Sequence, residues 1–432
     1  MITGAASSAA AIPPNSPIIG ARLGRYELVL IGLVVVVALF ARFDAASAFN
    51  AMHRNDPSRL VGDEPGYHYL AQQIATGQPL DWPGRMPLYP LFIGAIFALI
   101  GENLNGATYA QALVGAITVL LLMVLVQRYH GAPTALVCGL IVAVHPGLVT
   151  TVTRLLTEVL YVPLLLLAVA ALFELTRAPT VRTAVAFGVA VALATYCRPT
   201  SALLPALVLG VGAVRGWRRT ITLRLTAVAF GVLLVAMVPW TVHNWKMYGV
   251  LHPLASSNGA LWQGSPEYYQ LMRQGRTYLD IWKTELNPAL NGGHDVTWWA
   301  GDRYFTERGL RSIAQHPLTY VWYSLHKVAY YWVGHPTADW YFVGWLKWWG
   351  RVKGGFPFIW APVCLAAAWL LRRRLWSEFL PYGLVVAYFT VIHSLTWAEG
   401  RLSLPLHPLL SIWFACAMIS WSSASRRGRT LI

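Results

Sequence analysis

The chain has 432 residues, of which 56% are hydrophobic and only 12% are charged. A water-soluble domain carries about twice that charged fraction, so the composition indicates an integral membrane protein. The 33 Lys and Arg residues against 18 Asp and Glu give a formal net charge of +15. Cytoplasmic loops of membrane proteins show such an excess, and because no P-loop, dinucleotide-binding or nucleic-acid-binding motif accompanies it, we expect no nucleic-acid partner.

The apolar segments alternate with clusters of arginine. The first predicted span, about residues 26 to 47, follows Arg22 and Arg25 and lacks a cleavage site, so we expect an uncleaved anchor with its N-terminus inside. Further spans are predicted at about 107–127, 133–150, 155–173, 182–197, 199–214, 224–243, 356–371, 378–395 and 403–421. About ten spans with both ends cytoplasmic put every arginine cluster inside, as the positive-inside rule requires.

Two further apolar segments do not fit as spans. Residues 88–100 fall short of the roughly twenty residues that cross a bilayer, so we predict an interfacial or re-entrant helix. Residues 318–333 are rich in Trp and Tyr and carry His326 and Lys327 in the middle, which suits a helix lying flat on the external face. If this segment spanned the membrane, the number of spans would be odd and the C-terminal arginines would lie outside.

The expected architecture is an all-α polytopic protein, a single transmembrane domain over residues 1–432. Two large external loops, residues 48–106 and 244–355, carry interfacial helices and nearly all of the chemically interesting side chains. An enzyme with one active face has this asymmetry, whereas a transporter needs access from both sides of the membrane.

Several short motifs, in order along the chain, resemble those of a known superfamily. The run Gly-Asp-Glu-Pro-Gly-Tyr-His-Tyr at 62–69 and the run Arg-Met-Pro-Leu-Tyr-Pro at 85–90 resemble the first external loop of the GT-C glycosyltransferases that use lipid-linked sugars. Within that superfamily they are most similar to the branch of the protein O-mannosyltransferases and the lipid A aminoarabinose transferases. The likeness continues with His145-Pro146, Thr157-Glu158, Arg198-Pro199, Pro239-Trp240 with Asn244, His316-Pro317, and Arg401 with Pro405 and Pro408. One departure is His243, where related sequences often have Arg, so a phosphate contact made there in relatives is weaker or moved here.

The resemblance implies the GT-C fold and a membrane enzyme of the cell envelope. The implied reaction moves one sugar from a polyprenyl-phosphate donor to a glycan, lipid or protein acceptor, with inversion, at the periplasmic face of a bacterial inner membrane. We expect no cofactor and no metal, because the leaving group bears one phosphate and no cluster has firm metal spacing. The one candidate metal cluster in the sequence is His294 and Asp295 beside Asp302. The alternatives are a polyprenyl-lipid flippase or secondary transporter, and a scaffold subunit in which Asp63 is dispensable.

The adjacent acids Asp63 and Glu64 are the first candidate catalytic residues. Sugar transfer needs a base for the acceptor proton, and in the family the first acid of the pair occupies that position, so the resemblance makes Asp63 the base. Glu64 would orient a substrate hydroxyl or the local loop. The alternative without a catalytic role is that both are solvated charges or cap the helix that follows.

Arg85, Arg198 and Arg401 are predicted to bind phosphate, because all three lie at the external side against the positive-inside bias. The alternative is snorkelling, or an ion pair with Glu399 or Glu158. Tyr89, His243, Asn258 and Glu399 complete the predicted substrate-binding set. Aromatic side chains of the second loop either contact saccharide or form an interfacial belt.

Glu158 is the third candidate catalytic residue. It lies near the external end of a predicted span, where an unpaired carboxylate costs roughly 2 to 3 kcal/mol. Either it completes the site, or Arg154 neutralises it from four residues earlier on the same helix face. His145 either reaches the same cavity or is a satisfied buried histidine.

Overall fold

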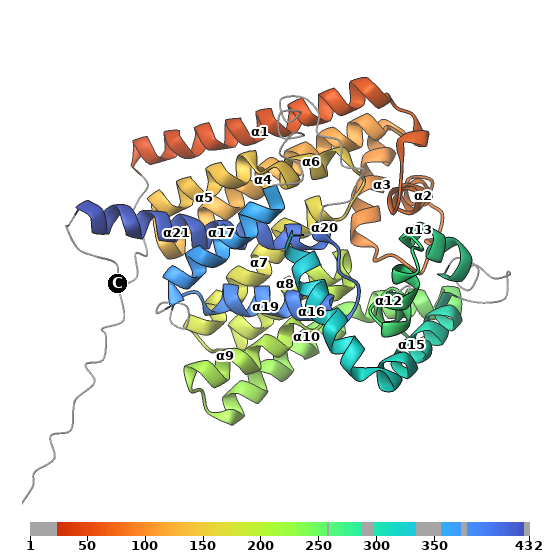
Figure 1. The fold of residues 1–432 in the computed structure, drawn as a ribbon. Helices are drawn as coiled ribbons and strands as arrows, with labels where there is room; N and C mark the ends of the chain where they lie inside the picture. Colours follow the sequence, from red (N-terminus) through yellow and green to blue (C-terminus); the bar gives the residue numbers. More distant parts are fainter. Residues whose placement is uncertain (1–23, 257–258, 287–297, 334–355, 373–377, 427–432) are drawn as a thin grey trace, which may run out of the picture.

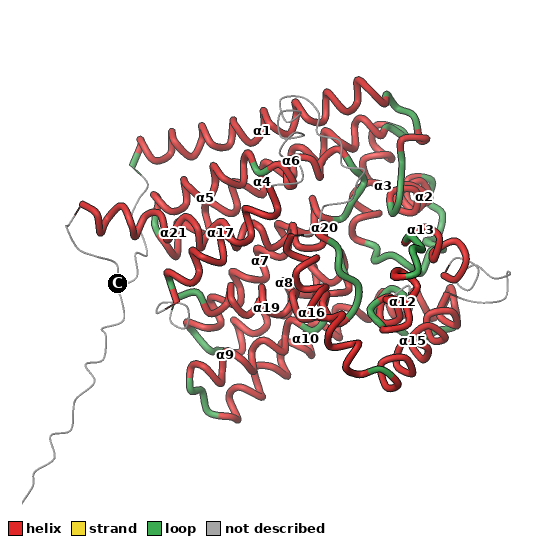
Figure 2. The backbone as a smooth tube through the Cα atoms, viewed as in Figure 1, coloured by secondary structure: helices red, strands yellow, loops and turns green. Residues whose placement is uncertain are grey.

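The fold of the chain comes from a computed structural model, which describes residues 24–256, 259–286, 298–333, 356–372 and 378–426. Within these ranges the chain is helical and forms no strand (Figure 2). The amino-terminal half comprises α1 (Arg25–His53), η1 (Pro57–Arg59), α2 (Glu64–Ala75), α3 (Leu88–Ile100), α4 (Leu104–His130), α5 (Ala132–Val144), α6 (Pro146–Thr150), η2 (Thr151–Thr153), α7 (Glu158–Arg177), α8 (Val181–Cys197), η3 (Pro199–Ser201), η4 (Leu204–Ala206) and α9 (Leu207–Arg215).

The carboxyl-terminal half begins with α10 (Arg219–Tyr248), the longest helix among the described residues. It continues with α11 (Ala260–Gln263), α12 (Pro266–Arg273), α13 (Tyr278–Ile281), η5 (Trp282–Leu286), α15 (Trp298–Gln315), α16 (Pro317–Val333), α17 (Phe356–Leu370), α19 (Leu380–Leu395), α20 (Gly400–Ser403), η7 (Leu404–Leu406) and α21 (His407–Arg426).

The apolar helices establish a multi-pass membrane protein. Within the described ranges, five segments are long and apolar enough to cross a bilayer, namely α1, α4, α7, α10 and Gly400–Ser422. A sixth is the bent pair formed by α5 with Pro146–Thr153, and the remaining predicted spans fall on shorter apolar helices at Val181–Cys197, Pro199–Arg215, Ile359–Leu370 and Leu380–Leu395. The segment predicted at 88–100 is the separate short helix α3. The count of ten spans and their orientation stay predictions.

The predicted span 133–150 is a broken helix. Its two parts, α5 and Pro146–Thr153, are bent by 55°. Pro146 causes the break, because proline lacks an N–H and keeps the preceding residue, His145, out of the helical region. The break leaves carbonyl groups without helical partners, and Arg42 of α1 donates from Nη1 to Ala143 O at 2.9 Å and from Nη2 to Val142 O at 3.2 Å.

Close packing holds Arg42 at this break. It is only 2% exposed, and Gly115 of α4 lies against its guanidinium group: a Cβ at Gly115 would stand 2.7 Å from Arg42 Nε. A charged side chain in the middle of an apolar span is costly unless it is satisfied. Here main-chain carbonyl oxygens of α5 accept hydrogen bonds from the charged guanidinium group. These contacts hold α1, α4 and α5 together at the break.

The two predicted external loops lie at the same end of the bundle. Figure 1 shows α2 and α3 of the first loop beside α12, α13 and α15 of the second. Hydrogen bonds join them, since Ser256 N donates to Pro83 O at 2.9 Å and the Tyr248 hydroxyl group donates to Leu80 O at 3.3 Å. The helix α16 packs against α19 and α20. Its predicted position flat on the membrane surface stays a prediction.

Candidate active site

Asp63 lies between two arginines. Its Oδ1 is 2.8 Å from Arg85 Nη2, and its Oδ2 is 2.9 Å from Arg401 Nη2. Asp63 is the residue before α2, but its side chain makes no capping hydrogen bond, which rules out the capping alternative. Its side chain is 38% exposed, so a ligand can reach it. Partial burial tends to raise the pKa of the Asp63 carboxyl, but the fields of Arg85 and Arg401 outweigh it and hold the pKa well below its usual range.

Arg401 is shared by three carboxylates. Besides Asp63, it lies 3.6 Å from Glu158 Oε1 through Nε and 3.6 Å from Glu399 Oε2 through Nη2. Glu399 immediately precedes α20, which carries Arg401 in its first turn. Partial burial raises the pKa of Glu399, and the opposing effect of Arg401 is smaller. Arg401 therefore connects Asp63, the residue before α2, to the buried acid Glu158.

Glu158 pairs with Arg198. Glu158 is fully buried, and its Oε1 lies 2.7 Å from Arg198 Nη2. Arg198 also donates from Nε to Thr157 Oγ1 at 2.7 Å, and its guanidinium group lies 5.3 Å from the centre of the Tyr161 ring. Glu158 Oε2 accepts no hydrogen bond among the described residues, so Arg198 and Arg401 supply the compensation for this buried charge.

The alternative in which Arg154 neutralises Glu158 is wrong. The helix α7 begins only at Glu158, so Arg154 and Glu158 do not share a helical face. Instead Arg154 Nη2 lies 2.9 Å from Glu64 Oε2, and both side chains are almost completely buried. Glu64 also accepts hydrogen bonds from Val61 N at 2.9 Å and Leu155 N at 2.7 Å. Glu64 thus fastens its own loop to the segment before α7, which fits the predicted loop-orienting role and leaves no free oxygen facing Asp63.

The other predicted substrate-binding residues lie at different distances from this cluster. Tyr89 is fully buried, and its hydroxyl group donates to Gln111 Oε1 at 2.8 Å. His243 stacks on Trp240 with ring centres 4.5 Å apart and uses Nε2 for the carbonyl of Leu80. Asn258 lies outside the described residues, as do His294 and Asp295 of the candidate metal cluster. The structure therefore brings together Asp63, Arg85, Glu158, Arg198, Glu399 and Arg401.

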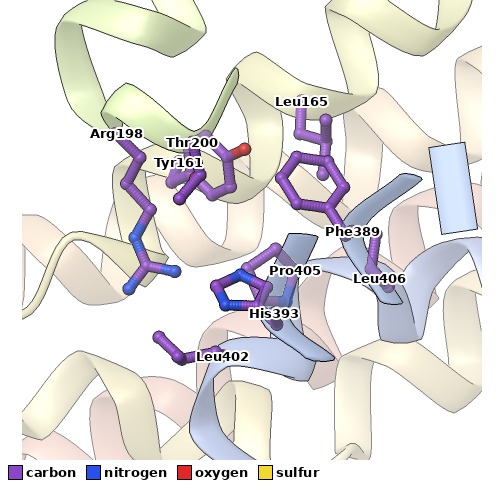
Figure 3. A pocket seen from close by; sticks show the side chains of 9 residues that line it. All are labelled: Tyr161, Leu165, Arg198, Thr200, Phe389, His393, Leu402, Pro405 and Leu406. Atoms are coloured by element: carbon purple, nitrogen blue, oxygen red, sulfur yellow. The ribbon is translucent and has the colours of Figure 1, made fainter. Parts of the chain in front are cut away.

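A pocket borders this cluster on the side of Arg198. Figure 3 shows the side chains that line it, which come from α7, from the connection between α8 and α9, from α19 and from the segment around η7. They are Tyr161, Leu165, Arg198, Thr200, Phe389, His393, Leu402, Pro405 and Leu406. Most of the lining is apolar, so the guanidinium group of Arg198 stands at the border between a charged and an apolar region.

The comparisons with known proteins agree with this architecture. The profile of the family described as dolichyl-phosphate-mannose-protein mannosyltransferase matches residues 81–243. The matched range includes Arg85, Glu158 and Arg198, whereas Asp63 and Arg401 lie outside it. No curated protein sequence matches the chain.

Solved structures match over nearly the whole chain. The oligosaccharyltransferase of Archaeoglobus fulgidus in complex with Zn and sulfate superposes with a TM-score of 0.54 at 12% identity, covering 92% of this chain and 50% of that one. The apo form of ArnT from Cupriavidus metallidurans gives 0.52 at 16% identity, covering 92% and 61%. The chain has the GT-C fold. The archaeal oligosaccharyltransferase AglB from Archaeoglobus fulgidus, in complex with an inhibitory peptide and a dolichol-phosphate, gives 0.51 at 12% identity, covering 94% of this chain and 51% of that one.

These figures confirm the predicted resemblance and fold. The GT-C fold here is the shared part, because the chain spans between half and about three fifths of the length of the solved structures that it matches. At such low identity the superposition establishes how the helices are arranged. The chemistry of this chain has to be inferred from its own side chains.

Other buried polar residues of this GT-C chain support the fold. His145 Nε2 lies 2.8 Å from His407 Nδ1, and His407 Nε2 lies 3.2 Å from Ser403 Oγ. His145 Nδ1 also accepts from Leu148 N at 3.2 Å. Both ring nitrogens of His145 are therefore engaged, so it is a satisfied buried histidine that links α6 to α21.

Two residues with clear roles were missed in the sequence. Arg42 stands in the middle of an apolar span, and such a charge is by itself a signal that a polar partner lies nearby. The sequence predicts that Lys327 faces the headgroup region, but Lys327 is 3% exposed and its Nζ donates hydrogen bonds to main-chain carbonyl oxygens. A sequence pattern gives no indication of those carbonyls, because they belong to distant segments.

Proposed function

We propose that the chain is a membrane glycosyltransferase that moves a sugar from a polyprenyl-phosphate donor to an acceptor at the external face of a bacterial inner membrane. The observation that carries this proposal is the position of Asp63, a partly exposed carboxylate held between the guanidinium groups of Arg85 and Arg401. A base for the acceptor and cations for a phosphate are the two groups that the transfer requires. A polyprenyl substrate is supported by the similar structure of the archaeal oligosaccharyltransferase AglB, which holds a dolichol-phosphate.

The arginines supply the phosphate site. Arg85, Arg198 and Arg401 are each at most 18% exposed in their side chains, so their charges act in a medium of low dielectric. Arginine presents a planar fork of donors and keeps its charge at every physiological pH.

The ion pairs also explain how Asp63 becomes a base. In the free protein Arg85 and Arg401 hold its pKa low, and a carboxylate in that state is a weak proton acceptor. The phosphodiester of the donor carries one negative charge, as a carboxylate does, so a bound donor competes with Asp63 for the two guanidinium groups. The pKa of Asp63 then rises when the donor is in place, and the base is activated only in the complex.

The reaction is a single displacement. The acceptor hydroxyl or amine attacks the anomeric carbon, Asp63 takes the acceptor proton, and the bond between that carbon and the phosphate oxygen breaks. The electron pair leaves with the polyprenyl phosphate, whose charge the arginines neutralise. Attack from the face opposite the leaving group inverts the anomeric configuration. We predict that no metal takes part in the transfer. Turnover should then be unchanged in the presence of a chelator.

The decisive experiment is release of polyprenyl phosphate by the purified protein. With a lipid-linked sugar and an acceptor, wild type releases polyprenyl phosphate only when the acceptor is present. Asp63→Asn abolishes transfer while donor binding persists, because the amide keeps the shape of the side chain but accepts no proton. Asp56→Asn is the matched control, since Asp56 is an exposed acid of the same loop that caps η1, and Asn caps equally well.

Two outcomes contradict the proposal. Full turnover by Asp63→Asn removes Asp63 as the base. Acceptor-independent movement of the intact lipid-linked sugar across a proteoliposome membrane, with no sugar transfer, favours a flippase instead.

A further inference from the structure

The helix α16 presents three donors on one face. Tyr320, Lys327 and Tyr331 are seven and four residues apart, a spacing that puts them on one side of a helix. All three reach the main chain of one short segment, residues 395–402, which connects α19 to α20. Tyr320 donates from its hydroxyl group to Leu395 O at 2.7 Å, Lys327 donates from Nζ to Thr396 O at 2.9 Å, and Tyr331 donates to Leu402 O at 3.2 Å.

The segment begins at the carboxyl-terminal end of a helix. Helix α19 ends at Leu395, so the last carbonyl groups of that helix have no helical partner. A lysine beside such carbonyls satisfies them and also interacts favourably with the negative end of the helix dipole. The capping group therefore comes from α16, and the bonds at Leu395, Thr396 and Leu402 hold both ends of the connecting segment.

Lys327 holds a third chain segment at the same point. Its Nζ also donates to Gly264 O at 2.9 Å, at the end of α11. Gly264 lies directly against the connecting segment, because a Cβ there would stand 2.6 Å from the carbonyl oxygens of both Leu395 and Thr396. The end of α11, the end of α19 and the face of α16 thus meet around one ammonium group.

Among the residues that the structure describes, no carboxylate contacts the ammonium group of Lys327. Its charge faces the two carbonyl oxygens and the rings of Tyr323, 4.6 Å from Nζ, and Tyr320, 5.5 Å away. Burial lowers the pKa of Lys327 to about 7, which means that the folded chain bears a cost for enclosing this group. A buried lysine used only to fill space is replaced more favourably by an apolar side chain. The role of Lys327 therefore lies in the hydrogen bonds that its ammonium group donates.

The segment held in this way carries Glu399 and Arg401. We propose that Lys327, with Tyr320 and Tyr331 on the same face of α16, positions residues 395–402 so that Arg401 meets Asp63 and Glu158. Lys327 is a positioning residue and touches no substrate. This role deepens the proposed glycosyltransferase function and rests on it for its effect on turnover.

The test uses the full-length protein in lipid nanodiscs. Lys327→Met keeps the length of the side chain and removes its donors. We expect amide hydrogen exchange in peptides covering 395–402 to increase at least tenfold, and the kcat of transfer to fall about 10- to 100-fold, the scale of a small misplacement of a reacting group. The acid limb of the kcat/KM profile, which reports the free enzyme, moves to higher pH because Arg401 no longer holds the pKa of Asp63 so low.

Two further variants keep the outcome clear. Tyr331→Phe removes a single hydroxyl group from the other end of the segment, keeps the packing of the ring, and changes exchange and the acid limb in the same direction by a smaller factor. Lys283→Met removes an exposed lysine from the second external loop and changes neither. Unchanged exchange of 395–402 in both Lys327→Met and Tyr331→Phe overturns the positioning role. Absence of transfer in wild type overturns the proposed function alone, since the exchange measurement needs no substrate.

Discussion

Arg401 Nη2 lies 2.9 Å from Asp63 Oδ2, although 338 positions separate the two residues along the chain. The pair joins the loop before α2 to the segment before α21. Through its other contacts Arg401 also reaches Glu158 and Glu399. One guanidinium group therefore organises all the acids of the candidate site except Glu64.

Replacement of Arg401 tests this organisation. Arg401→Lys keeps a positive charge but loses the planar fork, so it cannot reach Asp63, Glu158 and phosphate in the same geometry. We expect kcat to fall by about 10²- to 10³-fold, the loss found when one preorganised donor to a developing negative charge is removed. Steady-state kinetics of polyprenyl phosphate release measure this. Arg273→Lys, at an exposed position of α12, keeps wild-type rates, and a wild-type kcat in Arg401→Lys contradicts its role.

Glu158→Gln removes the acid between Arg198 and Arg401. The change leaves two buried cations with less compensation, and breaking a buried pair in this way costs about 3 to 5 kcal/mol. Thermal unfolding in nanodiscs measures the loss. Combining Glu158→Gln with Arg198→Met restores part of the stability, because the uncompensated charge is then gone, and strictly additive losses in the double variant show that the two residues are not coupled.

Glu64 and Arg154 form the second buried pair. Glu64→Ala removes the ion pair together with the acceptors for Val61 N and Leu155 N, so we expect a loss of about 3 to 5 kcal/mol in unfolding free energy. Glu64→Gln keeps one acceptor oxygen and loses less. Chemical denaturation of the two variants provides the comparison, and equal stability of Glu64→Ala and wild type shows that the pair does not hold the loop.

Acid pH weakens the ion pairs of Asp63. The folded-state pKa of Asp63 lies below its ordinary value of about 4. The stability that ionised Asp63 contributes is therefore complete above about pH 4, and it is lost as the pH falls further. Unfolding measured between neutral pH and the acid range shows a decline in wild type that is shallower in Asp63→Asn. The same slope in both proteins means that Asp63 is not stabilised by Arg85 and Arg401.

Gly264 and Gly383 form a matched pair of helix-end and helix-interior glycines. Gly264→Ala drives a Cβ against the main chain of Leu395 and Thr396, which cannot move aside as a side chain can, and overpacking of this kind costs about 1 to 3 kcal/mol. At Gly383, inside α19, a Cβ meets nothing within 4 Å, so Gly383→Ala stabilises the helix by about 0.5 to 1 kcal/mol. Thermal unfolding distinguishes the two directions, and a neutral Gly264→Ala shows that the contact is loose.

The elements of the fold were largely predictable from local patterns. Length and hydropathy placed each predicted span on a helix, and they separated the short helix α3 from the spans. The break at His145 could have been predicted from Pro146, but the partner of the freed carbonyls, Arg42, lies about a hundred positions away. The Arg154–Glu158 pair failed as a prediction because it assumed a helix that does not begin until Glu158.

The sequence by itself determined a multi-pass helical membrane protein, with acids and arginines concentrated outside the apolar spans, since hydropathy and charge are properties of each segment alone. Only the tertiary structure decided which arginine meets which acid. Arg401 with Asp63, Arg198 with Glu158 and Arg154 with Glu64 are pairs between separate segments, and Lys327 acts on carbonyl groups that every sequence contains. Such contacts depend on how the helices pack, because a charge in a region of low dielectric must find a partner among whatever groups the packing brings near.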